Sequence, residues 1–301
     1  MITISVLIPA RHEEFLQQTI DDVFAHAETN VEVLVALDNW ENPPCITVKQ
    51  GQIITTRAGQ RGATNLLARL AKGKYVMKLD AHCSLSQGFD RNMLEDMEED
   101  VTMVMGTCNL HAYDWVCPEG HRHFQGLYEK CEQCGSIDLK KDFIWNIVHR
   151  PMRSTFYFDT SLHFQYMPTD PPDQLLMESM SIQGSGFLCT RNKYWELDIC
   201  DEAFGSWGQQ GTEVACKTWL SGGRVLSTRK TWYGHQFRET EGFPYPNPTG
   251  AILAAQEYSR DIFLNNKWPK QVRSFQSLIR QFNYPGDWSE EKLTELCTGG
   301  D

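Results

Sequence analysis

The chain has 301 residues, of which 41% are hydrophobic and 22% charged, and its formal net charge is −11. A chain of this length folds without disulfide bonds, and its composition excludes disordered, collagen-like and coiled-coil proteins. No stretch approaches the roughly 20 apolar residues that span a bilayer, and the opening run Ile2–Pro9 is too short for a signal peptide. We therefore expect a cytoplasmic protein without a membrane partner, whose ten cysteines are reduced thiols, some of them metal-bound.

Apolar runs and helical patterns alternate over the first 110 residues. Strands are expected at 2–8, 31–37, 74–79 and 101–107, and helices at 13–28, 60–72 and 87–99. This alternation predicts a parallel sheet with helices on its faces, and such sheets bind ligands beyond the carboxyl ends of their strands. Asp38 and Asp80 each lie at the end of a predicted strand, so they mark the expected binding edge.

The alternation stops between residues 111 and 140, and the aromatic-rich segment 141–180 is expected to be irregular. Beyond it, the patterns predict strands at 181–190 and 224–232, and helices at 213–220, at 251–264 and after Ser289. Proline and glycine predict a loop over 242–250. The interruption at 111–140 therefore separates two α/β halves.

Cysteine and histidine gather within this interruption. Cys117 and His121 form a Cys-x₃-His pair, and Cys131 and Cys134 form a Cys-x₂-Cys pair. Four such ligands with no open position are typical of structural zinc, with His123 as the alternative to His121. The segment is therefore predicted to bind one zinc ion that is separate from any catalytic metal.

A carboxylate and two imidazoles stand at the ends of two predicted strands. Asp80 and His82 follow the strand that ends at residue 79, and His235 follows a strand much later in the chain. One carboxylate and two histidines suit Mn²⁺ or a similar divalent cation, which bridges phosphates and neutralises a leaving group. A surface aspartate beside a hydrogen-bonded histidine is the simpler explanation when this motif is considered alone.

Five ordered segments match the motifs of one family. They are Ile4–Pro9, Lys78–Cys83, Gly184–Phe187, Trp207–Gly223 and Gly234–Arg238. Together they resemble the family 2 glycosyltransferases of the GT-A type, and in particular the catalytic domain of the polypeptide N-acetylgalactosaminyltransferases. The resemblance covers about residues 2–110 and 180–240 and does not include the cysteine-rich segment.

The resemblance implies a role for each matching residue. Asp80, His82 and His235 would hold Mn²⁺ or Mg²⁺ on the donor diphosphate. The donor-binding residues that it implies are Pro9, Ala10, Glu13, Asp38, Arg61, Asp80, Gly184, Gly186 and Arg238. Trp207 would border the sugar, although packing in the core explains this tryptophan equally well.

One position departs from the family pattern. Gln210-Gly211 stands where the pattern has Glu-Asn, and neither residue accepts a proton at neutral pH. An inverting reaction would then need Glu213, Asp201 or Glu202 as its base, whereas a retaining reaction needs no separate base. We expect retention, with Trp207, Gln210 and Glu213 as the catalytic candidates. A favourable position in the first turn of a helix explains Glu213 equally well.

The predicted fold is α/β: a GT-A Rossmann-like α/β/α sandwich with a small zinc-binding insertion. Its predicted parts are a nucleotide-sugar-binding half (1–110), a zinc-knuckle insertion (111–140), a donor-sugar and acceptor half (141–240), and a lid loop with a helical tail (241–301). Within the last part, Gly242 is a candidate hinge, with Phe243 and Tyr245 closing over the donor. An ordinary surface loop explains this segment equally well.

The predicted function is metal-dependent transfer of a sugar from a nucleotide-sugar to a hydroxyl acceptor, with a UDP-sugar implied by the resemblance alone. The open acceptors are a hydroxymethylated base in phage-type DNA, a protein serine or threonine, and a small glycan or lipid-linked sugar. The basic segment 149–153 favours nucleic acid, whereas the net charge of −11 opposes it.

A non-catalytic protein that binds a nucleotide-sugar or a nucleic acid is the alternative of a different class, because Gln210 replaces a glutamate. The retained Asp80, His82 and His235 argue against it. We expect neither the lectin domain nor the membrane anchor of the resembled enzymes. We therefore expect a bacterial or phage protein that acts in the cytoplasm.

Overall fold

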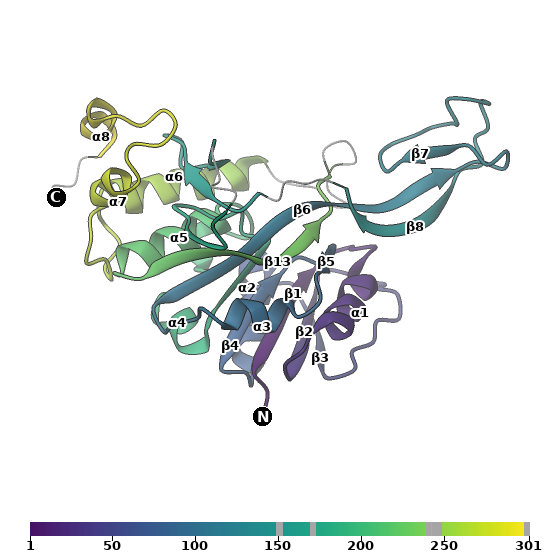
Figure 1. Ribbon diagram of the computed structural model, residues 1–301, viewed down its shortest axis with the longest axis horizontal. Helices are drawn as coiled ribbons and strands as arrows, with labels where there is room; N and C mark the ends of the chain where they lie inside the picture. Colours follow the sequence, from purple (N-terminus) through teal and green to yellow (C-terminus); the bar gives the residue numbers. More distant parts are fainter. Residues whose placement is uncertain (149–152, 169–172, 239–241, 243–248, 298–301) are drawn as a thin grey trace.

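The computed structural model describes residues 1–148, 153–168, 173–238, 242 and 249–297. Its centre is a β-sheet with helices on both faces, and a long arm of strands projects from the body (upper right in Figure 1). The strand order in the body is β11-β13-β6-β12-β4-β1-β2-β3. This architecture confirms the predicted α/β sandwich.

The first half of the sheet is parallel, as predicted. Its strands are β1 (Ile4–Ala10), β2 (Val31–Asp38), β3 (Gly51–Thr56) and β4 (Tyr75–Leu79), and its helices are α1 (Leu16–His26), α2 (Gly59–Leu70) and α3 (Phe89–Leu94). β2 is buried along its whole length because helices cover both faces, which explains its continuous apolar sequence. The edge strand β3 is largely exposed and lacks an apolar run, so the sequence pattern missed it.

The second half of the sheet is mixed, and the sequence predicted no direction for its strands. β12 (Gly186–Thr190) runs antiparallel to β4 and to β6 (Val101–Val116), while β13 (Arg224–His235) runs parallel to β6. β11 (Leu176–Glu178) closes this edge in the antiparallel direction. Periodicity identifies buried strands but carries no information on their direction, and the described residues between β6 and β12 contain no crossover helix.

Short elements complete the body. They are β5 (Cys83–Leu85), β9 (Phe156–Phe158), β10 (Phe164–Tyr166), α4 (Arg191–Glu196), a 3₁₀ helix at Glu202–Phe204, α5 (Gln210–Leu220), α6 (Thr249–Leu264), α7 (Phe275–Gln281) and α8 (Glu290–Leu296). None of the helices within the described residues is long and apolar enough to cross a bilayer.

The arm is built on β6, which continues beyond the body. Its outer part pairs with β7 (Arg122–Phe124) and with β8 (Lys140–Ile147), both antiparallel. The cysteine-rich segment forms the end of this arm. The segment 141–180 was predicted to be irregular, but it contains β8 to β11, whose strands are short or half-exposed and lack a clear pattern.

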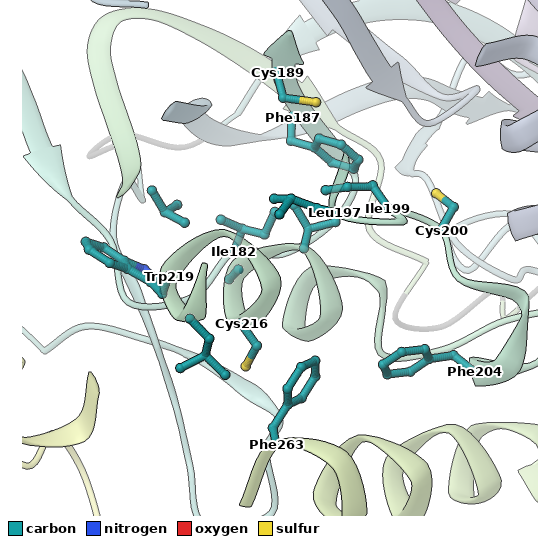
Figure 2. Close-up of a cluster of buried hydrophobic side chains, with 14 of the residues drawn as sticks. Ile182, Phe187, Cys189, Leu197, Ile199, Cys200, Phe204, Cys216, Trp219 and Phe263 are labelled. Carbon is teal, nitrogen blue, oxygen red and sulfur yellow. The ribbon is translucent and has the colours of Figure 1, made fainter. Parts of the chain in front are cut away.

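Two apolar clusters lie on opposite faces of the sheet. One packs α1 and α3 against the first strands. The other surrounds α5, where Cys216 and Trp219 lie among side chains that include Phe187 of β12 and Phe263 of α6 (Figure 2). Packing on both faces fixes the positions of the strands, and the polar side chains described next lie at the ends of these strands.

Candidate active site

Strand pairing brings Asp80, His82 and His235 together. Asp80 follows β4, and its backbone N–H donates to the carbonyl of Ser185 at 2.8 Å. β5 pairs with the end of β13, which places His235 opposite Cys83 and beside His82. Nε2 of His235 lies 3.1 Å from Nε2 of His82 and 3.3 Å from Oδ2 of Asp80. Adjacent ligands about 2.1 Å from one octahedral ion are separated by about 3 Å, so this spacing suits a divalent cation.

Glu13 contacts His82 on the side of the imidazole ring that faces away from His235. Its Oε2 lies 3.2 Å from Nδ1 of His82, which leaves Nε2 of His82 to face His235. The guanidinium of Arg238 pairs with the same carboxylate. Burial acts to raise the pKa of Glu13, but His82 and Arg238 outweigh burial and hold this pKa at about 2. Glu13 is therefore ionised at neutral pH and can accept a hydrogen bond from Nδ1 of His82, the arrangement that leaves Nε2 available to a metal.

The other two members of the triad are also in metal-binding protonation states. Burial acts to raise the pKa of Asp80, but the charge of Lys78 and the hydrogen bond from His235 hold it well below its usual range. Burial lowers the pKa of His235 to about 4, against the opposing hydrogen bond with Asp80. An ionised carboxylate and a neutral imidazole are the forms that bind a cation.

The depressed pKa of His235 predicts how acid affects the metal-free protein. Between pH 6.5 and 4 the unfolded chain binds a proton at this position and the folded chain does not, so stability falls as the pH falls through this window. We expect a loss on the order of 1–3 kcal/mol in unfolding experiments with a chelator present. His235→Gln should remove this decrease in stability between pH 6.5 and 4. His163→Gln, which changes an exposed histidine, should not alter it. An unchanged pH profile in His235→Gln would contradict the assignment.

A cavity of about 590 Å³ extends from the triad across the carboxyl ends of β1 and β2. Its lining includes the predicted donor-binding residues Pro9, Ala10, Glu13, Asp38, Asp80 and Arg238. Asp38 accepts a hydrogen bond from the backbone N–H of Gly59 at 3.0 Å, which joins the end of β2 to the start of α2. The cavity is large enough for a nucleoside diphosphate. We call it the nucleotide cavity.

A second cavity of about 230 Å³ lies on the other side of the triad. Asp80, His235 and Trp207 line both cavities, and the predicted residues Gly184 and Gln210 line the second one. We call this space the sugar cavity. Gly186, predicted as a donor-binding residue, begins β12 and packs near Leu79 and the ring of Tyr233; it does not line either cavity.

Arg61 and Glu213 form a buried ion pair, which corrects the two predictions that placed them at the site. Both side chains are 0% exposed, and Nε of Arg61 lies 3.1 Å from Oε2 of Glu213. Lys217 approaches the other carboxylate oxygen at 3.1 Å. Arg61 also donates to the carbonyls of Gly205 and Gly208. These residues flank Trp207, so Arg61 supports the loop that carries Trp207 and does not face the nucleotide cavity.

Replacing Glu213 tests this structural role. Glu213→Gln leaves Arg61 and Lys217 buried without their shared carboxylate, so we expect a loss of about 3–5 kcal/mol in the free energy of unfolding, measured with urea. Glu196→Gln is the matched control, because Glu196 is exposed and its pair with Lys193 is worth under about 1 kcal/mol. Equal stability of the two variants would show that the buried cluster contributes little.

The other carboxylates considered as bases also lie away from the sugar cavity. Asp201 accepts a hydrogen bond from the N–H of Ala203, and Glu202 accepts one from Asn65. Asp80 is the one carboxylate among the described residues that line this cavity. Sequence reasoning also missed several residues that line it, among them Lys78 and His163. Lys78 stood inside a recognised motif, whereas His163 lies in a segment that has no pattern.

The Cys/His group at the end of the arm has the spacing of a tetrahedral site. Nδ1 of His121 lies 3.5 Å from Sγ of Cys117 and 3.5 Å from Sγ of Cys131. Sγ of Cys134 lies 3.7 Å from Sγ of Cys117. Bonds of about 2.3 Å to sulfur and 2.0 Å to nitrogen give edges of about 3.8 and 3.5 Å. His123, the alternative ligand, instead contacts Cys131 through Nε2 at 3.2 Å.

The hydrogen bonds to Cys131 support its role as a thiolate. Burial acts to raise its pKa, but the N–H of Cys134 and the His123 ring lower the pKa to about 5. A thiolate is the form of cysteine that binds metals. The predicted lid falls outside the described residues, apart from Gly242, as does most of the basic segment 149–153.

The fold and the two joined cavities define a glycosyltransferase domain of the GT-A type. Residues 5–142 match the model of the family described as glycosyl transferase family 2. The putative polypeptide N-acetylgalactosaminyltransferase 13 of Drosophila melanogaster is 26% identical over 67% of this chain and 32% of its own length. The human polypeptide N-acetylgalactosaminyltransferase 13 is 25% identical over 81% of this chain and 37% of its own length.

Solved structures show the same fold. GalNAc-T7 with UDP, GalNAc and Mn²⁺ superimposes with a TM-score of 0.63 at 19% identity, covering 88% of this chain and 49% of that chain. TarS of S. aureus superimposes with a TM-score of 0.52 at 10% identity, covering 93% of this chain and 42% of that chain. The chain spans about a third of the length of the two N-acetylgalactosaminyltransferases compared above.

Proposed function

We propose that this protein transfers a sugar from a UDP-sugar to a hydroxyl acceptor and that the reaction depends on a divalent cation, Mn²⁺ or Mg²⁺. The observation that carries this proposal is the position of Asp80, His82 and His235 where the nucleotide cavity meets the sugar cavity. A donor that fills both cavities places its diphosphate at this junction. The cation supplies charge neutralisation of the departing diphosphate when it is bound.

The residues of this chain have separate tasks in that reaction. Asp80, His82 and His235 would hold the cation, and Glu13 keeps His82 oriented through its 3.2 Å contact. Asp38 and Gly59 border the nucleoside part of the nucleotide cavity. Trp207 stands between the two cavities, on the loop that Arg61 supports, and separates the sugar from the nucleoside.

We propose that the anomeric configuration of the donor is retained. The support is the lack of a free carboxylate in the described lining of the sugar cavity, since Glu213 is buried in its ion pair and Asp80 belongs to the proposed cation site. A departing phosphate oxygen then accepts the proton of the attacking hydroxyl on the same face of the sugar. NMR of the product tests this step. An inverted product, combined with loss of turnover in His163→Gln, would identify His163 as the base instead.

We propose that the end of the arm binds one structural zinc ion through Cys117, His121, Cys131 and Cys134. The sulfur and nitrogen separations match the edges of a zinc tetrahedron, and four protein ligands leave no open position for substrate. His123 then serves as a hydrogen-bond donor to the sulfur of Cys131.

The acceptor that we propose is an uncharged hydroxyl compound, either a protein serine or threonine or a glycan. A small cavity between the arm and the loop that precedes α1 shares Gln236 and Arg238 with the nucleotide cavity, so an acceptor can approach along it. Its two cations, Lys141 and Arg238, are paired with Glu14 and Glu13, which disfavours a phosphate-rich acceptor such as phage-type DNA.

The deciding experiment is incubation with a panel of nucleotide-sugars and Mn²⁺, followed by measurement of released nucleotide and mass spectrometry of the acceptors. The acceptors are peptides with serine and threonine, oligosaccharides, lipid-linked sugars and hydroxymethylcytosine DNA. Nucleotide release and a mass increase by one sugar would support the proposal. Tight binding of UDP without release from any donor would favour the non-catalytic binding protein, and transfer to DNA would overturn the acceptor assignment.

A further inference from the structure

Lys78 is a buried cation inside a central strand. Its side chain is 1% exposed, and it lies in β4 two residues before Asp80, so both side chains point to the same face of the sheet. The neighbours on this strand are apolar, including Val76 and Leu79. A lysine here costs free energy of desolvation that an apolar residue avoids, so packing alone does not account for it.

The ammonium group of Lys78 is held by two acceptors. It donates to Oδ1 of Asp80, and it donates to the carbonyl oxygen of Gly184 at 2.9 Å. Gly184 has φ +90°, and a Cβ there would meet the backbone nitrogen of Gly211 at 2.8 Å. Lys78 therefore connects the triad to a turn in the wall of the sugar cavity that only glycine can form.

This contact divides the carboxylate of Asp80 between two partners. Oδ1 is taken by Lys78, whereas Oδ2 lies 3.3 Å from Nε2 of His235. A cation held between His82 and His235 is therefore offered one oxygen of Asp80 and not both. The carboxylate cannot rotate to give two oxygens while Lys78 holds the first.

Lys78 also cancels the charge of the triad. Asp80 contributes one negative charge, the two histidines are neutral when they bind a metal, and the charge of Glu13 is balanced by Arg238. The protein groups around the cation thus sum to about zero. Affinity for a hard divalent cation increases with the number of charged oxygen ligands, and the diphosphate of the donor supplies the ones that are missing here.

We propose that Lys78 is a positioning residue that restricts Asp80 to one coordinating oxygen and makes tight cation binding depend on the nucleotide diphosphate. This inference rests on the proposed function. It predicts that the cation and the nucleotide strengthen each other's binding by the same factor, because coupling between two sites is reciprocal.

The test measures Mn²⁺ binding with and without UDP in the wild type and in Lys78→Met. We expect Lys78→Met to bind Mn²⁺ at least about 10-fold more tightly without UDP and to lose a similar part of the enhancement by UDP. The Mn²⁺ concentration for half-maximal turnover should fall while kcat also falls. A merely structural role of Lys78 would not produce these opposite changes.

Lys74→Met is the matched control, because Lys74 is an exposed lysine just before the same strand and its loss removes the same charge. Lys78→Gln keeps a hydrogen-bond donor for the carbonyl of Gly184. If Lys78→Met does not fold, Mn²⁺ binding is measured in Lys78→Gln instead. Unchanged or weaker Mn²⁺ binding in a folded Lys78 variant overturns this inference. A wild type that binds no Mn²⁺ with UDP present and turns over fully in EDTA overturns the metal dependence of the proposed function instead.

Discussion

Replacement of Asp80 by asparagine is expected to lower kcat for sugar transfer by about 1,000-fold or more. Asparagine keeps the shape of the side chain but removes the one carboxylate of the triad, so the departing diphosphate loses its charge compensation. Released UDP, followed in saturating Mn²⁺ and donor, measures the effect.

Asp21→Asn is the control for this variant, because Asp21 is an exposed aspartate on α1 away from both cavities. It should keep wild-type turnover. Circular dichroism and a thermal melt establish that Asp80→Asn is folded, which matters because Lys78 loses its partner. Wild-type turnover of Asp80→Asn, or full activity of the wild type in EDTA, would refute the assigned role of the triad.

Loss of the proposed zinc ligands is expected to unfold the end of the arm and leave the body intact. Among the described residues of 117–136, the buried side chains include Cys117, His123 and Cys131, so the proposed ion replaces the missing apolar core. In Cys131→Ser we expect zinc content to fall from one ion per chain to near zero. Hydrogen exchange over 117–136 should rise by orders of magnitude, while β1 to β4 keep their protection.

Cys45→Ser provides the matched control, because Cys45 is an exposed thiol that is not part of the Cys/His group. This variant should retain zinc and the exchange pattern of the wild type. Elemental analysis of the wild type, purified without chelators, tests the assignment. A protein that contains no zinc would contradict it. Zinc retained in Cys131→Ser would show that His123 or another residue completes the site.

The sequence was informative where the chemistry depends on local patterns. Asp80 and His235 were placed at strand ends because apolar runs stop directly before or at them, and the pairing of β5 with β13 confirms that these ends meet. The spacing of Cys117, His121, Cys131 and Cys134 likewise predicted a group of ligands that the fold does bring together. In both cases, the residues adjacent in the sequence were enough to predict the site.

Contacts between distant segments were the part that the sequence could not reveal. Arg61 and Glu213 are separated by 152 positions, so nothing near either residue shows that each neutralises the other inside the core. The direction of β12 was also hidden, because an antiparallel strand buried on both faces has the same apolar sequence as a parallel one. Lys78 was overlooked because a lysine before an aspartate is unremarkable until burial is known.

The first and last residues of the arm lie side by side where the arm joins the body. The backbone N–H of Val148 donates to the carbonyl of Asn109 at 2.9 Å, and Leu110 of the outgoing strand β6 pairs with Ile147 of the returning strand β8. A hairpin that leaves and returns at neighbouring positions can be lengthened, shortened or exchanged without altering the sheet register that fixes Asp80 and His235. Insertions or deletions in the arm would therefore leave the positions of Asp80 and His235 unchanged.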